Sequence, residues 1–328
     1  MAEVKRHLVS DDEGDMRLDR WFKVHFPQVT FAYLNKLTRT GQVRVGAGRV
    51  KTNARLKPGD EIRVPPLAFD RRPADTPKED VTPLTREERR LFDSMVIHED
   101  KDIFVLNKPS GFAVQGGTKT FRHLDGLLMG LGKDLGERPL LVHRLDRDTS
   151  GVIAVAKRRA IASALGTLFA TRNVKKTYWA VVKGVPVPAQ GKIDIALIKA
   201  KGPDGDRMRP SKEGEEDDEQ QAVTQYSTID RAGKIAAWLS LRPMTGRQHQ
   251  LRAHAAHLQT PIFGDNKYNG DNELPGGVEN VLHLHARRLV FPHPRGGTMD
   301  ITAPLPSHML KTFALLGFDA NRFDAHDD

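Results

Sequence analysis

A run of charged and hydroxyl-bearing residues lies between two apolar segments near the middle of this 328-residue chain. The apolar segments are residues 140–142 and 152–156, and the run between them is His143-Arg144-Leu145-Asp146-Arg147-Asp148-Thr149-Ser150-Gly151. Charges beside buried strands are costly unless they are paired or take part in chemistry. The run therefore indicates either a polar connecting loop or a catalytic loop in which a carboxylate lies beside cations.

Composition limits the class of protein. The chain has no cysteine, which excludes thiol catalysis, disulfides and cysteine-ligated metals and fits a reducing cytosol. No signal peptide follows Met1, and no apolar run is long enough to span a bilayer. A length of 328 residues predicts about two domains. We therefore expect a cytoplasmic, monomeric protein without membrane contact.

Basic charge is concentrated near the N-terminus. The whole chain has a net charge of +9. Between Arg17 and Pro66, eleven lysines and arginines face three acidic residues, an excess of eight. Such clustering is what a surface that contacts phosphate backbones requires. A polyanionic partner is therefore expected for this segment.

The chain before residue 67 predicts a small basic domain behind a flexible tail. Apolar residues at helical spacing and short alternating segments define its elements. The expected elements are a tail over residues 1–16, helices over 17–26 and 30–41, and strands over 43–45 and 61–64.

Residues 17–66 resemble an S4 RNA-binding domain. The matching sequence motifs are Arg17-Leu18-Asp19, Gly41-Gln42-Val43-Arg44-Val45 and Lys57-Pro58-Gly59-Asp60-Glu61-Ile62. The chain has Phe31-Ala32 where S4 domains usually have a Ser-Arg pair at the start of the second helix. The resemblance implies binding of structured RNA, with Lys36, Arg39 and Arg44 as basic contacts.

Residues 67–90 are rich in proline and mixed charge, which predicts an extended linker. Residues 91–328 then form the second domain. Strand and helix patterns alternate there without a regular βαβ repeat, which favours an α+β fold with a mixed, largely antiparallel sheet flanked by helices. Strands are expected near residues 102–108, 152–156, 177–182, 235–241, 284–291 and 299–302, and helices near 124–128, 160–169, 251–258 and 307–317.

Metal and nucleotide sites are not indicated. The thirteen histidines include no His-Glu-x-x-His pattern, and no glycine-rich loop precedes Lys-Ser or Lys-Thr. Asp146-Arg147-Asp148 is similar to the Asp-x-Asp of phosphotransferases with an aspartyl nucleophile. Those enzymes have an apolar strand directly before the first aspartate, where this chain has His143-Arg144. We expect no metal and no cofactor.

Four separate sequence motifs are similar to those of the RluA-type pseudouridine synthases. They are His143-Arg144-Leu145-Asp146-x-x-Thr149-Ser150-Gly151, Lys176-x-Tyr178, Thr245-Gly246-Arg247-x-His249-Gln250-x-Arg252-x-His254 and Pro261-Ile262-x-Gly264-Asp265. With the S4-like segment in front, residues 17–317 are most similar to the RluC-type enzymes of bacterial large-subunit ribosomal RNA. The resemblance implies an isomerase that converts specific uridines of 23S ribosomal RNA to pseudouridine.

The resemblance also implies roles for individual residues. Asp146 corresponds to the catalytic carboxylate, and Arg247 to the arginine that forms an ion pair with it and holds it in one orientation. Tyr178 corresponds to the aromatic residue that stacks on the target base. Whether Asp146 attacks the sugar or the base, or starts a glycal route, stays open.

Further residues are expected around the target nucleotide. Arg144 corresponds to the side chain that fills the gap left by the flipped nucleotide. His143 is expected to contact RNA, and Leu251 is expected to pack in the pocket wall. Asp148 is the alternative catalytic carboxylate.

Two other functions fit parts of the pattern. One is a transfer RNA pseudouridine synthase on the same catalytic fold. The other is an RNA-binding ribosome assembly factor without catalysis. The set of Asp146, Tyr178 and Arg247 favours an enzyme, because a pure binding protein has no need for a buried carboxylate–arginine pair.

Overall fold

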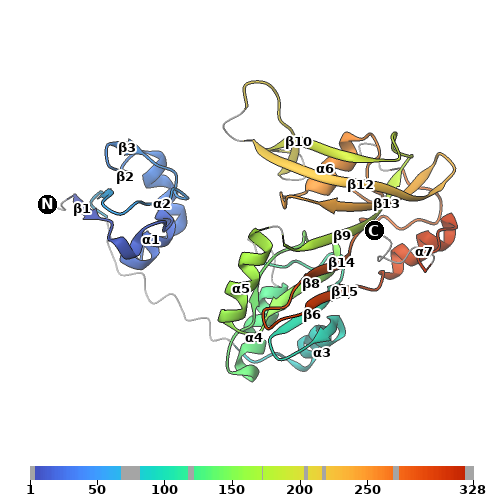
Figure 1. The fold of residues 1–328 in the computed structure, drawn as a ribbon, viewed down its shortest axis with the longest axis horizontal. Helices are drawn as coiled ribbons and strands as arrows, with labels where there is room; N and C mark the ends of the chain where they lie inside the picture. The colour runs from blue at the N-terminus through green and yellow to red at the C-terminus, as the bar shows by residue number, and fades with distance from the viewer. Residues whose placement is uncertain are drawn as a thin grey trace. The chain divides into compact units, whose positions relative to one another are not determined.

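A computed structural model describes residues 4–67, 82–116, 122–171, 173–202, 206–215, 219–268 and 273–321. The chain divides into two compact units, Met1–Asp80 and Val81–Asp328. We call these the N-terminal unit and the C-terminal unit. Figure 1 labels most of their helices and strands. Each unit has its own buried apolar core.

The N-terminal unit combines two helices with a four-stranded sheet of order β1-β4-β2-β3. The elements are β1 (Lys5–Leu8), α1 (Leu18–His25), α2 (Phe31–Arg39), β2 (Arg44–Val45), β3 (Gly48–Arg49) and β4 (Glu61–Val64). Helix α1 ends before Pro27. The Tyr33 N–H donates to Thr30 Oγ1 at 3.2 Å and caps α2. Apolar residues of both helices, including Trp21 and Leu34, share one core with Ile62 of β4.

Within the predicted tail over residues 1–16, the described residues from 4 onward do not form the flexible segment that their polar composition predicts. Strand β1 pairs antiparallel with β4, with Lys5 opposite Val64. A short 3₁₀ helix, η1 (Asp11–Glu13), follows, and Val9 between them is buried. Strand pairing depends on backbone hydrogen bonds, which do not require apolar side chains. The prediction of a tail was therefore wrong over residues 5–13.

The C-terminal unit is built on an eleven-stranded sheet, whose main path runs β11-β10-β12-β13-β9-β14-β8-β6-β5. Strand β15 pairs with β14, and β7 pairs with β8. Its strands are β5 (Val96–Glu99), β6 (Ile103–Lys108), β7 (Leu140–Leu141), β8 (Ser150–Ala156), β9 (Lys175–Lys183), β10 (Gln190–Ala200), β11 (Arg207–Pro210), β12 (Gln220–Ala232), β13 (Ala236–Pro243), β14 (Leu284–Pro292) and β15 (Thr298–Thr302). Among the described strand pairs, only β8 with β14 is parallel. The predicted α+β fold with a mixed, largely antiparallel sheet is confirmed.

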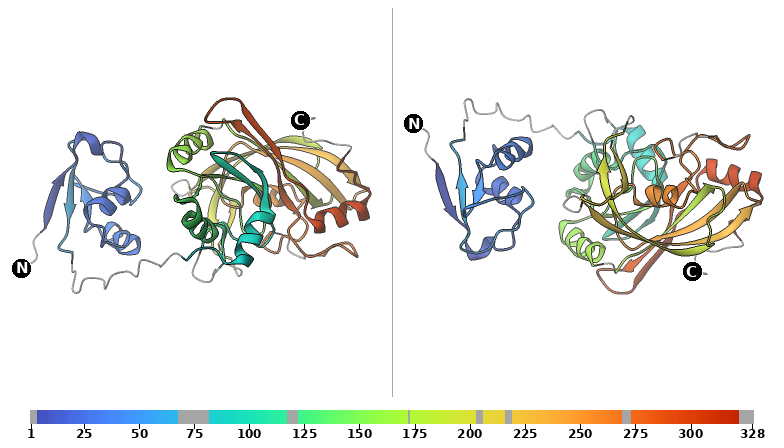
Figure 2. Two further views of the ribbon diagram at one scale, coloured as in Figure 1. Left: turned by 90° about the horizontal axis from the view of Figure 1, so that it is seen from below. Right: turned by 90° about the horizontal axis from the view of Figure 1, so that it is seen from above.

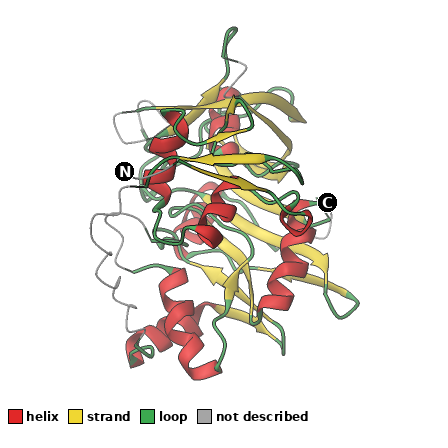
Figure 3. Ribbon diagram, turned by 90° about the vertical axis from the view of Figure 1, so that its left-hand side faces the viewer, coloured by secondary structure: helices red, strands yellow, loops and turns green. Residues whose placement is uncertain are grey.

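Helices pack on both faces of this sheet, as the views in Figures 2 and 3 show. They are α3 (Arg86–Met95), α4 (Leu124–Leu135), α5 (Arg159–Ala170), α6 (Gln250–His257) and α7 (Ser307–Leu316). Alternate strand residues point to opposite faces. In β13, Trp238 packs in a cluster with Phe313 of α7, whereas Leu239 packs in a cluster with Leu251 of α6. Helices α6 and α7 therefore cover opposite faces.

Helix α3 begins inside the segment, residues 67–90, that composition predicts to be a linker. The Glu88 N–H donates to Thr85 Oγ1 at 3.2 Å, and the Thr85 N–H donates to Glu88 Oε2 at 3.0 Å. This reciprocal cap is indicated by the pattern Thr85-x-x-Glu88. The first helix of the C-terminal unit thus starts at Arg86, before the predicted boundary at residue 91. Residues 68–81 of the linker prediction lie outside the described residues.

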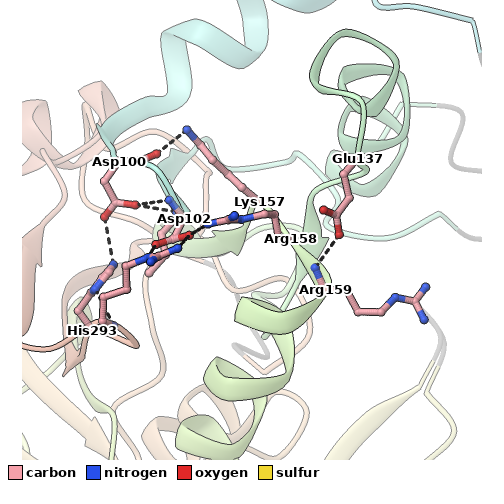
Figure 4. A network of polar contacts seen from close by, with 9 residues as sticks. Asp100, Asp102, Glu137, Lys157, Arg158, Arg159 and His293 are labelled. Carbon is pink, nitrogen blue, oxygen red and sulfur yellow. Dashed lines mark hydrogen bonds and ion pairs between the residues drawn. The ribbon is translucent and has the colours of Figure 1, made fainter.

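A charged network joins loops at the carboxyl ends of β8 and β14 (Figure 4). The Asp102 carboxylate is buried and accepts hydrogen bonds from Arg158, after β8, and from Arg295, after β14. The Arg295 and then the Arg158 guanidinium hold the pKa of Asp102 well below its ordinary value. The neighbouring Asp100 carboxylate accepts the Asp102 N–H at 2.7 Å. This network fixes the strand ends that lie away from residues 143–149, which precede β8.

Candidate active site

Residues 142–149 form the loop between β7 and β8, and a pocket of about 380 Å³ lies beside it. The lining residues come chiefly from this loop, from β9, from the segment that leads into α6 and from the first turn of α6. The sequence-predicted residues that line it are His143, Arg144, Asp146, Tyr178, Arg247 and Leu251. The structure therefore brings these residues together, whereas Lys36, Arg39 and Arg44 belong to the N-terminal unit.

The start of β8 fits closely against β14. Gly151 has φ +111°, and a Cβ atom there would lie 2.2 Å from the Ala286 carbonyl oxygen. Ser150 Oγ lies 2.9 Å from His285 Nδ1, and His285 Nε2 lies 3.2 Å from the Ala303 carbonyl oxygen, to which it donates. The Ser150 hydroxyl is therefore the donor to His285 Nδ1. These contacts fix the point at which the loop joins its strand.

A buried lysine holds the loop by its backbone. Lys108, at the end of β6, is 0% exposed. Its Nζ donates at 2.8–2.9 Å to three carbonyl oxygens, those of Pro109, Phe112 and Arg147. Burial lowers the pKa of Lys108 to about 7, against the opposing charges of Asp148 and Asp146. The sequence assigned Lys108 no role, because its burial follows only from the packing of the loop.

The two carboxylates of the loop have different surroundings. Asp148 Oδ1 accepts from Arg147 Nε at 2.9 Å in an ion pair. Asp146 lines the pocket, and its carboxylate forms no hydrogen bond or ion pair with any other described residue. A carboxylate without a partner inside a pocket is available to react with a ligand. The structure thus distinguishes Asp146 from Asp148.

Tyr178 lies on β9 and packs against the apolar clusters on either side of it. Burial, and to a smaller degree the charge of Asp146, raise the pKa of Tyr178 far above its ordinary value. Its hydroxyl group is therefore protonated at neutral pH. The ring is held in place by apolar contacts and also lines the pocket.

Arg247 does not form the ion pair with Asp146 that the resemblance implies. Its Nε donates to the Gln221 carbonyl oxygen at 3.1 Å, and its side chain is exposed. The Arg247 N–H donates to Gln250 Oε1 at 3.0 Å, which ties this segment to the start of α6. Among the described residues, Arg247 has no carboxylate partner. The expected pair with Asp146 is therefore absent among the described residues, and the role of Arg247 stays a prediction.

Arg252, in the first turn of α6, is the buried arginine of the pocket and is 4% exposed. Its Nε and Nη2 donate to the two Asp265 carboxylate oxygens at 2.8 and 2.6 Å. Against the effect of burial, the hydrogen bonds and charge of Asp265, and then the charge of Asp146, raise the pKa of Arg252. Arg252 is thus a fixed positive charge in the pocket, held in place by Asp265.

His249 precedes α6 in the left-handed conformation, with φ +50°. Such a conformation is uncommon for a residue other than glycine and is often found at functional sites. His249 Nδ1 lies 3.1 Å from the Tyr268 hydroxyl. Burial lowers the pKa of His249, although Asp146 opposes the shift. His249 and Tyr268 are neighbours of the site that the sequence did not assign.

His143 joins the loop to β8. Its Nε2 accepts the Ala154 N–H at 2.9 Å, and its ring stacks on Phe169 with centroids 4.3 Å apart. Burial, with a smaller effect of Lys176, lowers the pKa of His143 to about 3. The imidazole is therefore neutral and carries its proton on Nδ1. This geometry favours a positioning function over the RNA contact that was expected.

Arg144 and Leu251 occupy opposite environments in the pocket. Arg144 is exposed, and its Nη1 lies 3.5 Å from Gln115 Oε1, a long and weak contact. Leu251 is buried in the apolar cluster that contains Leu239. Arg144 is thus free to move into a ligand, whereas Leu251 shapes the wall.

Comparison with known proteins gives consistent matches. Residues 102–257 match the family described as RNA pseudouridylate synthase. The chain is 35% identical over 316 residues to ribosomal large subunit pseudouridine synthase C of Escherichia coli strain K12, covering 92% of this chain and 93% of that protein. The protein of the same name from Salmonella typhi is 34% identical over 327 residues, covering 95% and 97%.

A solved structure is also similar. Human RNA Pseudouridylate Synthase Domain Containing 4 has a TM-score of 0.60 and 31% identity, covering 71% of this chain and 98% of that chain. Within the described residues, no helix is long and apolar enough to cross a membrane.

Proposed function

The chain belongs to the RluA-type family of RNA pseudouridine synthases, isomerases that act on RNA, and we propose that it modifies uridines of large-subunit (23S) ribosomal RNA. The relatives named ribosomal large subunit pseudouridine synthase C support this substrate, because they match 92–95% of the chain. Such a match extends into the basic N-terminal unit. Ribosomal RNA as substrate also implies a cytoplasmic location in a bacterium.

The observation that carries this proposal is the unpartnered Asp146 carboxylate in a pocket with a buried arginine and a protonated tyrosine. Pseudouridine formation breaks the bond from ribose C1′ to uracil N1 and joins C1′ to C5 of the same base. The C5 proton is lost and N1 gains one, so no redox step or cofactor is needed. Asp146 starts the reaction, because an anionic and unhindered carboxylate forms reversible adducts.

Tyr178 and Arg252 support this step in different ways. The Tyr178 ring stacks on the target uracil, which contributes about 1–3 kcal/mol per stacked base. Arg252 provides positive charge near Asp146, and its two hydrogen bonds to Asp265 keep the guanidinium in place before substrate binds. Preorganised charge of this kind is effective because nothing has to reorient during the reaction.

Arg144 fits the space that a flipped uridine leaves. A uridine stacked in RNA hides its glycosidic bond, and flipping it out costs a few kcal/mol. Arg144 is exposed at the pocket and has only a long contact with Gln115 among the described residues. Its guanidinium is therefore free to enter the RNA and stack on the neighbouring bases.

The N-terminal unit serves as an S4-like RNA-binding domain in this proposal, over residues 17–66, and residues 91–328 carry the catalysis. Lys36 and Arg39 are exposed on α2 and line one hollow of this unit. Arg44 differs, because its Nε donates to the Gly41 carbonyl oxygen at 3.0 Å. Lys36 and Arg39 are therefore better suited than Arg44 to bind phosphates. The protein acts as a monomer in this proposal.

The test is Asp146→Asn in the full-length chain, with pseudouridine mapped in ribosomal and transfer RNA. Without the carboxylate, pseudouridine formation is expected to fall by on the order of 10⁴-fold or more, whereas RNA affinity is retained. Asp148→Asn is the matched control and is expected to stay active. Normal turnover by Asp146→Asn would overturn the catalytic assignment. Pseudouridine found only in transfer RNA would overturn the substrate.

A further inference from the structure

Phe31 is an aromatic side chain on the surface of the basic N-terminal unit. It is the first residue of α2 and is 58% exposed. By contrast, three aromatic residues of the preceding helix α1 and its C-terminal flank contact one another inside or at the edge of the core. They are Trp21, Phe22 and Phe26. Phe31 therefore contributes little to this core, and another reason is needed for an aromatic ring in water.

Two hollows adjoin Phe31. Lys36, Arg39 and Lys51 line one of them, and Arg20 and Lys23 line the other. Phe31 lines both hollows. The ring thus lies between two groups of cations, which is the arrangement that single-stranded nucleic acid binding requires.

The cations in the first hollow are available to a ligand. Lys36, Arg39 and Lys51 are exposed, and none of them has an ion pair with another described residue. Arg17, at the edge of the same hollow, differs because its guanidinium donates to both carboxylate oxygens of Asp19 at 3.2 and 2.6 Å. Exposed cations without carboxylate partners attract phosphates, and this charge favours RNA over a protein as the occupant.

We propose that Phe31 stacks on an unpaired base of the RNA while Lys36, Arg39 and Lys51 bind the adjacent phosphates. This inference rests on the proposed function, since it identifies which feature of the RNA the N-terminal unit recognises. Only loops, bulges and ends offer an unstacked base face, because bases inside an RNA helix are stacked on their neighbours. The unit therefore binds a looped or bulged nucleotide in preference to continuous duplex.

The test compares Phe31→Ala with Phe31→Trp in the full-length chain. The probes are two RNA hairpins that are closed by the same compact tetraloop, in which the bases are stacked, and that are identical except for one bulged adenosine. Phe31→Ala is expected to weaken binding of the bulged hairpin by roughly five- to a hundredfold and to leave the fully paired hairpin unchanged. Phe31→Trp is expected to keep the affinity, and its fluorescence is expected to fall on binding, because the indole ring stacks on the base. The change can be attributed to residue 31, since the native Trp21, Trp179 and Trp238 are buried.

Leu8→Ala is the matched control, because Leu8 is an apolar side chain of the same unit that is 72% exposed and lines neither hollow. Its affinity for both hairpins is expected to equal that of the wild type. Equal affinity of Phe31→Ala and wild type for the bulged hairpin would overturn the inference. So would an equal loss on both hairpins.

A second assay separates this inference from the proposed function. Wild type and Phe31→Ala are incubated with a protein-free 23S ribosomal RNA transcript at limiting enzyme, and pseudouridine is counted. Lower formation by Phe31→Ala, restored at saturating enzyme, supports the stacking role. No pseudouridine from wild type overturns the proposed substrate, although the hairpin result stands. Full formation by both proteins at limiting enzyme overturns the stacking role alone.

Discussion

The two units use charge in opposite ways. In the N-terminal unit, Lys36, Arg39 and Lys51 are exposed and have no ion pair with another described residue. In the C-terminal unit, Arg252 and Asp265 are buried and paired through two hydrogen bonds. Exposed charges act over about 10 Å and are screened by salt, whereas buried charges are screened much less. RNA affinity and catalysis should therefore respond to different substitutions.

After Asp146→Asn, the largest effect is expected from Arg252→Met. This change removes the fixed cation of the pocket and leaves the buried Asp265 carboxylate unpaired. We expect kcat to fall by on the order of 10²-fold or more, and the free energy of unfolding to fall by about 3–5 kcal/mol. Single-turnover assays at saturating RNA and urea unfolding measure the two effects.

Two further variants identify the reason for such a loss. Arg252→Met with Asp265→Asn removes the uncompensated charge, so stability is expected to recover while kcat stays low. Arg247→Met is expected to keep kcat, because the Arg247 guanidinium contacts the Gln221 carbonyl oxygen and not Asp146. A larger loss of kcat in Arg247→Met than in Arg252→Met would restore Arg247 as the partner of Asp146.

The next effect is expected from Lys108→Met, which removes three hydrogen bonds to backbone carbonyls around the catalytic loop. A looser loop misplaces Asp146, so kcat is expected to fall roughly tenfold or more. RNA affinity and its salt dependence should stay unchanged, because Lys108 is fully buried. A loss confined to RNA affinity would contradict this positioning role.

Lys108 also predicts a dependence of stability on pH. Its pKa is lowered from 10.5 to about 7 by burial. Between these values the unfolded chain binds more protons at this position than the folded chain, so stability increases with pH. Wild type should therefore gain stability relative to Lys108→Met from pH 7 to pH 10 in urea unfolding. An unchanged difference would show that Lys108 stays charged throughout.

A moderate loss of stability is expected at acidic pH because of the buried His285. Burial lowers the pKa of His285 from 6.5 to about 3. The contribution of the neutral ring is thus complete above about pH 6.5 and is lost as the pH falls toward 3. Urea midpoints should decrease from pH 7.5 to pH 5, and less steeply in His285→Asn. If the urea midpoints of the two proteins decrease in parallel, His285 is excluded as a source of the acid sensitivity.

The smallest effects are expected from Lys36→Ala and Arg39→Ala in the N-terminal unit. Each removes one phosphate contact, so the slope of log affinity against log salt should fall by about 1, with kcat at saturating RNA unchanged. Arg55→Ala is a suitable comparison, because Arg55 Nη1 already pairs with Asp15 Oδ2 at 2.7 Å. A change in kcat without a change in the salt-dependence slope would contradict the assignment of RNA binding to the N-terminal unit and catalysis to the C-terminal unit.

Much of the fold could be predicted because its elements carry local patterns. Helix α2 has a Thr30 cap and one apolar side, and β8 is an apolar run. The long strands β10 and β12 were missed because their apolar pattern is weak. The buried residues of β10 are Ile193 and Leu197, and β12 buries the small Ala222 and the polar Thr224. Strands β12 and β13 form a local hairpin, whereas β10 pairs with β12 across the intervening β11.

The sequence by itself determined the chemical groups of the site. They are Asp146 between two apolar runs, Tyr178 in a strand pattern, and two arginines, Arg247 and Arg252, in one sequence motif. Only the tertiary structure decided which arginine is buried near Asp146. Helix α6 begins at Gln250, after the left-handed turn at His249, so Arg252 lies inside against Asp265 and Arg247 lies outside. Burial and ion pairing depend on packing between distant segments, and local spacing carries no information about that packing.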